Sequence, residues 1–183
     1  MAERFRSLSP ELAEWWRAQR VFFVATAPVG ADGHVNLSPK GYDTLRVLAP
    51  DRVAYLDLTG SGVETIAHLR ENGRITLMAC AFDGPPRISR IYGHGTVHLL
   101  GTPEFGALAP GFPELPGRRS IVEVTVSAVS TSCGYAVPLM ELVGERDRLK
   151  EWATARGDDG IVAYWSSKNA TSIDGLPGLG TGT

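Results

Sequence analysis

A chain of 183 residues has room for one domain with a substantial core, and its 43% apolar and 21% charged residues are typical of a soluble globular protein. The net charge of −2 gives no basic field that would hold nucleic acid or an anionic membrane, so neither is expected as a partner. We expect no secretory signal and no bilayer span, because the first residues lack an apolar stretch and the longest apolar run, 21–27, is far below the roughly 20 residues required. Two cysteines are too few for a disulfide scaffold. We therefore expect a cytoplasmic protein.

The first predicted element is a helix over 9–18. Its start at 9–11 combines a capping serine, a proline suited to the first turn and an acidic residue. A run rich in β-branched and aromatic residues follows at 21–26 and predicts a strand. Turn residues at 30–33 then predict a hairpin whose second arm is 34–38.

The middle of the chain alternates between strand and turn signals. A strand is predicted at 53–58, and a helix at 63–70 that Asn and Gly residues terminate. Two further strands are predicted at 74–82 and 88–100, and a short helix opens at 102.

The last third of the chain begins with a strand and continues with helices. Apolar and polar residues alternate over 120–130, as in a half-buried strand. Helices are predicted over 144–156 and 159–166, and the glycine-rich tail from 176 is expected to be mobile at its end.

These elements favour a mainly β fold of the α+β class. Six strands with a single helix between them, in place of a regular alternation, indicate a six-stranded antiparallel β-barrel with peripheral helices. We expect one domain over 1–183, with an N-terminal helix in 1–19, the barrel in 20–131, and a helical extension and tail in 132–183.

The most informative stretch is the glycine turn between the strand at 53–58 and the helix after it. Gly60 and Gly62 free the backbone, while Thr59, Ser61 and Thr65 offer hydroxyl groups where a helix begins. Unpaired N–H groups and a partial positive charge suit such a turn to phosphate. The alternative is a plain turn in which Ser61 caps the helix. The stretch alone leaves both interpretations open.

A second polar stretch follows the first strand. Asn36, Ser38 and Lys40 lie at or near a strand end, where they could hold an anion or the polar edge of a flavin ring. By itself this stretch reads more simply as a polar loop with a solvated lysine.

Three segments together resemble the pyridoxamine 5'-phosphate oxidase-like family of FMN-binding split barrels. They are 36–43 (Asn-Leu-Ser-Pro-Lys-Gly-Tyr-Asp), 59–65 (Thr-Gly-Ser-Gly-Val-Glu-Thr) and 69–75 (Leu-Arg-Glu-Asn-Gly-Arg-Ile), in matching order and spacing across about 22–129. The resemblance is to a bacterial subgroup. It implies a split β-barrel and a homodimer that binds FMN at its interface, with Ser38, Lys40 and Thr59 at the flavin site.

The sequence departs from the family at one place. Pyridoxamine 5'-phosphate oxidases proper carry Ser-Arg-Lys where this chain has Val63-Glu64-Thr65, so the usual cations for the phosphate are missing. The phosphate would then rest on hydroxyl and N–H groups and on an arginine such as Arg87 or Arg90. We therefore expect a chemistry other than pyridoxamine phosphate oxidation.

The function expected is that of an FMN-dependent oxidoreductase acting on an unidentified small molecule, with NADH or NADPH as the candidate reductant. The sequence indicates no catalytic side chain and no metal site. Three alternatives stay open: a non-catalytic flavin carrier, a haem-binding protein with His34, His94 or His98 as ligand, and an enzyme using a deazaflavin. The polar segment 168–177 either frays or, as in the family, reaches the partner's flavin site.

Overall fold

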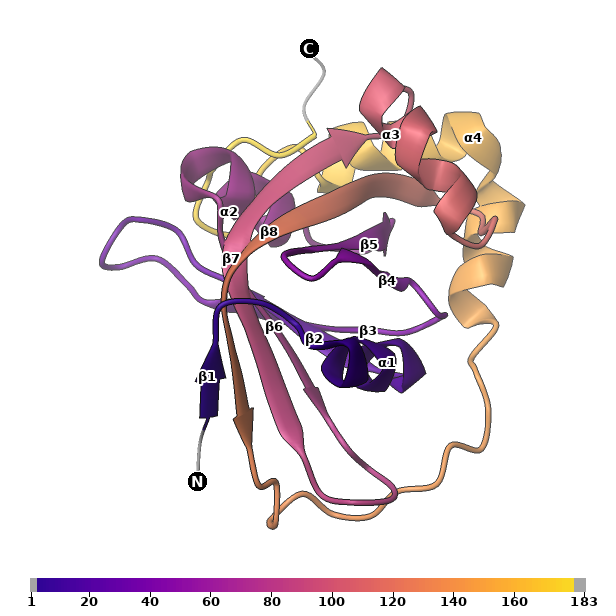
Figure 1. Ribbon diagram of the computed structural model, residues 1–183. Coiled ribbons are helices and arrows are strands. Elements are labelled where there is room, and N and C mark those ends of the chain that lie inside the picture. Colours follow the sequence, from indigo (N-terminus) through magenta and orange to yellow (C-terminus); the bar gives the residue numbers. More distant parts are fainter. Residues whose placement is uncertain (1–2, 180–183) are drawn as a thin grey trace.

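One antiparallel sheet organises the fold in the computed structural model, which describes residues 3–179 (Figure 1). Hydrogen-bonded neighbours follow the order β3-β2-β6-β7-β8-β5-β4, and β1 pairs with β8 off this path. Within the described residues there are eight strands: Glu3–Phe5 (β1), Phe22–Thr26 (β2), Asn36–Lys40 (β3), Leu45–Ala49 (β4), Arg52–Leu58 (β5), Arg74–Cys80 (β6), Ile88–Leu99 (β7) and Arg118–Ser132 (β8).

The sheet curls until its two ends approach each other. β3 and β5 lie near opposite ends of the strand order, yet Lys40 Nζ in β3 is 2.8 Å from Asp57 Oδ1 in β5. Pro39 lies inside β3, and β3 is an edge strand, where a residue without an N–H group is tolerated.

The six predicted strands are confirmed, but the count of six is wrong because β1 and β4 were missed. β1 has three residues, all exposed, so its sequence carries no burial pattern. β4 (Leu-Arg-Val-Leu-Ala) lacks a clean alternation of apolar and polar residues and is fixed by antiparallel pairing with β5. Both strands are therefore specified by their partners rather than by local sequence.

Four α-helices and one 3-10 helix surround the sheet in the part of the chain that the structure describes: Pro10–Ala18 (α1), Glu64–Asn72 (α2), Pro103–Leu108 (α3), Ala109–Gly111 (3-10) and Arg148–Lys168 (α4). Ser9 caps α1 as predicted, accepting a hydrogen bond from the Leu12 N–H at 3.1 Å. The two helices predicted near the C-terminus form α4, which is broken at Gly157 (φ 63°) and begins at Arg148, four residues later than expected. No helix among residues 3–179 is long and apolar enough to cross a membrane.

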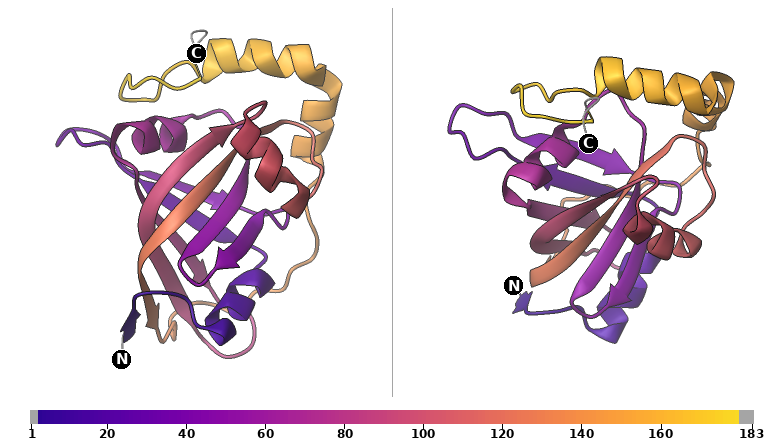
Figure 2. Two further views of the ribbon diagram at one scale, coloured as in Figure 1. Left: turned by 45° about the horizontal axis from the view of Figure 1, so that its top comes forward. Right: turned by 90° about the horizontal axis from the view of Figure 1, so that it is seen from above.

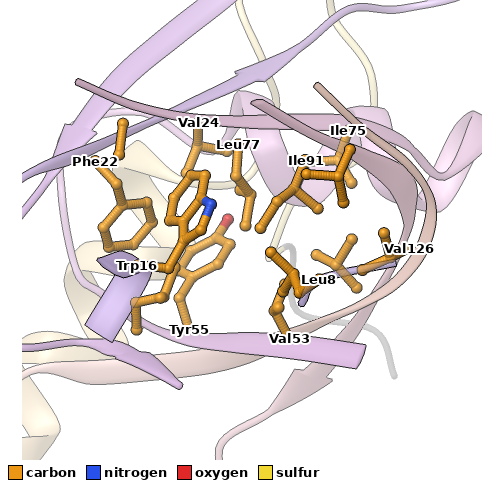
Figure 3. Close-up of a cluster of buried hydrophobic side chains, with 14 of the residues drawn as sticks. Leu8, Trp16, Phe22, Val24, Val53, Tyr55, Ile75, Leu77, Ile91 and Val126 are labelled. Carbon is orange, nitrogen blue, oxygen red and sulfur yellow. The ribbon is translucent and has the colours of Figure 1, made fainter. Parts of the chain in front are cut away.

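The main core lies inside the curled sheet and is closed at one end by α1 (Figure 3). Trp16 of α1 is almost fully buried beside Phe22 and Tyr55, and its Nε1 donates to Ser89 Oγ at 3.0 Å. Each such side chain, when fully buried, stabilises the fold by about 1.5–3 kcal/mol. A smaller cluster packs α3 against β5 and β8 through Phe105, Leu56 and Ile121.

Two irregular segments complete the chain. The connector, residues 133–147, runs along the outside of the molecule from β8 to α4 (Figure 2). After α4, the tail (residues 169–179) turns back toward α2, where Arg70 of α2 donates to the Gly178 carbonyl. The predicted mobile end of the tail, 180–183, lies outside the described residues.

Candidate functional site

A buried carboxylate joins the two ends of the curled sheet. Asp57 is fully buried and accepts from Lys40 Nζ at 2.8 Å and from Arg119 through Nε at 2.8 Å and Nη2 at 2.7 Å. Burial on its own raises the pKa of Asp57, but the charges of Arg119 and Lys40 outweigh it and lower that pKa to about 2. One carboxylate between two cations leaves a surplus of positive charge in this cluster.

The backbone of the glycine turn faces this cluster with its carbonyl groups. Arg119 Nη1 donates to the Gly62 carbonyl at 2.9 Å. Asn169 Nδ2 donates to the carbonyls of Gly60 at 3.1 Å and Ser61 at 3.4 Å. Three consecutive carbonyls of the turn are therefore directed toward Arg119 and Asn169.

Thr59 begins the turn and is buried. Its hydroxyl donates to the Gly117 carbonyl at 2.9 Å and accepts from Trp165 Nε1 of α4 at 2.8 Å. This side chain therefore anchors the start of the turn to α4 and to the residue that precedes β8.

Asn36, Ser38 and Thr65, three of the predicted site residues, are joined by hydrogen bonds. Asn36 Nδ2 donates to Thr65 Oγ1 at 3.0 Å, and Asn36 Oδ1 accepts from Ser38 Oγ at 3.0 Å. Asn36 also reaches Thr26 Oγ1 at 3.4 Å, which is 3.0 Å from Nδ1 of the buried His68. Burial lowers the pKa of His68, so this ring is neutral near pH 7. The structure thus ties β3 to the first turn of α2.

Ser61 and Glu64 lie on the outer side of the turn, and the interpretation of Ser61 as a helix cap is wrong. The N-cap of α2 is Val63, with no side-chain hydrogen bond, so Ser61 does not cap the helix and stays exposed. Glu64 folds back over the turn, because a methyl group placed on Gly62 would lie 2.1 Å from Glu64 Oε2. A carboxylate therefore lies at the place where a phosphate was predicted.

Arg90 is not brought to this cluster. It alternates with buried Ser89 and Ile91 on β7, so it lies on the outward face of the sheet, opposite Met78 and Ser130 on the flanking strands. The neighbouring Arg87 is also held elsewhere, since its Nη2 is 3.2 Å from Glu11 Oε1.

Lys40 also borders a cavity of about 1160 Å³. It lies between the end of α1, the end of β3, the loop after β6 and the connector, and its lining includes Trp15, Phe82, Met140 and Arg87. The Met140 N–H donates to the Phe82 carbonyl at 2.9 Å, which fixes the connector over this cavity. Lys40 thus lies between the polar cluster and a space large enough for a small-molecule ligand.

Three central residues of the cluster, Asp57, Arg119 and Asn169, were not predicted as site residues. Asp57 gave a signal, because it interrupts the apolar strand 53–58. Asn169 belongs to the polar segment 168–177, which the sequence marked as unusual without revealing what it contacts. Arg119 gave none, since its partners are 62, 57 and 50 positions away along the chain.

The three histidines considered for haem each have a protein neighbour. His34 Nδ1 lies 2.6 Å from Asp174 Oδ1 in the tail, His98 Nε2 lies 3.1 Å from Glu123 Oε2, and His94 packs against Gly73. Across residues 3–179, His, Cys, Asp and Glu side chains form no group of three or more that could hold a metal ion.

A curled antiparallel sheet, with polar side chains converging where β3 and β5 end beside α2, is the arrangement expected for a cofactor-binding protein of the split-barrel class. The family model of pyridoxamine 5'-phosphate oxidase matches residues 8–133. The chain belongs to this family, as the sequence motifs predicted.

A relative in sequence agrees with this assignment, and solved structures share the fold. The pyridoxamine 5'-phosphate oxidase family protein ustO of Aspergillus flavus is 40% identical over 194 residues, covering 96% of this chain and 77% of that protein. A HupZ variant from group A Streptococcus has a similar fold, with a TM-score of 0.54, 19% identity and coverage of 68% of this chain and 99% of its own. A candidate pyridoxamine 5'-phosphate oxidase from Lactobacillus delbrueckii has a TM-score of 0.51, 22% identity, and coverage of 68% and 94%.

Proposed function

We propose that the protein is an FMN-dependent oxidoreductase of the split-barrel type, with the flavin bound at the interface of a homodimer. The observation that carries this proposal is the orientation of the glycine turn in a chain of this family. When bound, FMN supplies hydride or electron transfer, while the protein holds the phosphate, polarises the ring and shapes the substrate space.

The turn fits a phosphate through its backbone. In a trans peptide the C=O and N–H bonds point in opposite directions, and the described residues contain no cis peptide. Because the carbonyls of 60–62 point toward Arg119 and Asn169, the N–H groups of Ser61, Gly62 and Val63 point away from them. None of these three N–H groups donates a backbone hydrogen bond within residues 3–179. Unpaired N–H groups near a helix N-terminus favour an anion.

Side chains add to this fit. Thr65 Oγ1 accepts from Asn36, so its own hydroxyl proton is available to an acceptor. Ser61 is exposed at the same turn. Lys40 borders the cavity, and its charge would favour negative charge on a reduced flavin ring bound there.

Pyridoxamine phosphate oxidation is not the reaction we propose. The Arg-Lys pair of those enzymes is replaced by Glu64 and Thr65, and Glu64 lies against the turn. We propose instead that an unidentified small molecule binds in the cavity beside Lys40, with NADH or NADPH as the reductant.

Extraction of the cofactor tests the proposal. The purified protein, reconstituted with flavins if needed, is expected to release FMN, identified by its absorbance and by mass spectrometry. Release of a deazaflavin, or a Soret band from bound haem, would replace FMN by one of the alternatives. A protein that binds none of these would overturn the proposed function.

A further inference from the structure

Asn169 is a buried amide on which the turn and the tail converge. It is fully buried, accepts from Arg119 Nη1 at 3.2 Å, and donates to the carbonyls of Gly60 and Ser61. Its own backbone carbonyl accepts from the Leu179 N–H at 2.6 Å, so the tail turns around it. Gly178 closes this turn tightly, since a methyl group there would lie 2.4 Å from that carbonyl and 2.6 Å from Val63.

Arg119 lies directly behind the turn and is almost fully buried. Asp57 neutralises one unit of the positive charge that Arg119 and Lys40 bring, so the cluster keeps a surplus cation beneath the Gly62 peptide. The guanidinium attracts the Gly62 carbonyl and thereby directs the Val63 N–H to the opposite side. A buried charge with few water molecules around it is weakly screened and acts over a longer distance than a surface charge.

We propose that Arg119 and Asn169 are positioning residues of the phosphate site, and that together they replace the basic pair this chain lacks. This inference rests on the proposed function. Arg119 supplies the positive charge from behind the turn, Asn169 fixes both Arg119 and two turn carbonyls, and the tail that carries Asn169 is part of the site. No contact between either side chain and the phosphate is required, because both act through the peptide groups of the turn.

Flavin affinities of the full chain with and without the phosphate group test this role. The dissociation constants of FMN and riboflavin are measured by flavin fluorescence for the natural protein and for Asn169→Leu. Leu keeps the approximate shape of Asn but removes its hydrogen bonds to the turn and to Arg119. We expect the preference for FMN over riboflavin to fall at least about tenfold, while riboflavin affinity changes little, since charge-assisted phosphate contacts are lost.

Two further variants separate positioning from simple stability. Asp174→Asn weakens another contact of the same tail, that with His34, and leaves the turn intact, so it is expected to keep the natural FMN preference. Arg119→Lys keeps the charge but cannot contact Asp57, Gly62 and Asn169 in the same geometry. It is expected to reduce the FMN preference in a folded protein, as judged by thermal unfolding, and therefore tests the proposal even if Asn169→Leu does not fold.

The outcomes distinguish the inference from the function on which it rests. A natural protein that binds FMN and riboflavin equally would contradict the phosphate site itself. A natural protein that prefers FMN, with Asn169→Leu and Arg119→Lys keeping that preference or weakening both ligands equally, would overturn the positioning role alone.

Discussion

Lys40 illustrates how much a single side chain depends on its surroundings. The sequence alone favoured a solvated loop lysine, whereas in the structure Lys40 ends β3, pairs with buried Asp57 and borders the cavity. Asp57 thus partly balances the charge of Lys40. The lysine side chain borders the space where we propose that the flavin ring and substrate meet.

Replacing Lys40 by Ala is expected to lower the midpoint potential of the bound flavin, because a nearby cation stabilises the anionic reduced form. The unfolding free energy is expected to fall by about 1.5–3 kcal/mol through loss of the hydrogen bond to a charged partner, with Asp57 still paired to Arg119. Spectroelectrochemical titration and urea unfolding measure the two effects. Lys150→Ala, which removes a partly exposed lysine paired with Asp147, is the matched control. An unchanged potential would show that Lys40 does not face the ring.

The low pKa of Asp57 predicts how the stability of the protein changes in acid. Its folded pKa of about 2 lies below the usual value of 3.8, so its contribution to stability is present above pH 4 and is lost as the pH falls toward 2. The difference corresponds to about 2 kcal/mol. Urea unfolding of the natural protein and of Asp57→Asn, compared at pH 5 and pH 2.5, measures it. Protonation of His68 affects both proteins and cancels in the comparison. Equal losses in the two proteins would contradict the low pKa.

At the scale of elements, features that depend on contacts between near neighbours were predicted correctly, whereas those that depend on long-range contacts were not. Ser9 and Pro10 predicted the start of α1 correctly because helix capping is a contact between near neighbours. The start of α2 was less clear, since Ser61 has the right side chain for a cap but the turn is held by Arg119 and Asn169 instead. β4 was missed because its pairing with β5, not its own pattern, makes it a strand.

The same division applies to the candidate site. The motifs at 36–40 and 59–65 were found from sequence because their residue types are distinctive and contiguous. Arg119 and Asn169 were missed because their role depends on a tail and a strand that meet the turn only in the folded chain. Arg90 was predicted from residue type alone, and its strand directs it to the outer face.

Glu64 gives the test that belongs to α2. Its carboxylate in the first helical turn is favourable for the helix dipole, by about 0.3–1 kcal/mol, but it lies against the turn where we propose that the phosphate binds. Like charges about 4 Å apart repel by about 1 kcal/mol even in bulk water. Glu64→Gln is therefore expected to bind FMN at least about fivefold more tightly, at a small loss of stability. Riboflavin, which lacks the phosphate, is the control ligand and should bind unchanged. A parallel gain for both flavins would mean that Glu64 acts on the ring or on the fold.

For the whole molecule, the outward face of the sheet is the surface that best fits a second copy of the chain. Register places Leu37, Ala25, Thr76 and Tyr92 side by side across β3, β2, β6 and β7, and Leu37 is 64% exposed. Phe23 and Met78 form the next row, which Arg90 continues on β7. A largely apolar face across four strands favours burial against a protein partner, and one of these strands, β3, ends at Lys40 of the polar site.

We expect the protein to be a homodimer at micromolar concentration, and Phe23→Glu to convert it to a monomer, because its register neighbours Pro39 and Met78 carry no charge and the new carboxylate would be buried without a partner. Multi-angle light scattering after size exclusion measures the mass of each form. Val162→Glu places the same charge on an exposed apolar position of α4 and is expected to leave the dimer intact. A natural protein that is monomeric with flavin still bound would contradict the shared site. A Phe23→Glu protein that stays dimeric would move the interface away from this face, toward the exposed apolar residues of the connector such as Leu139 and Val143.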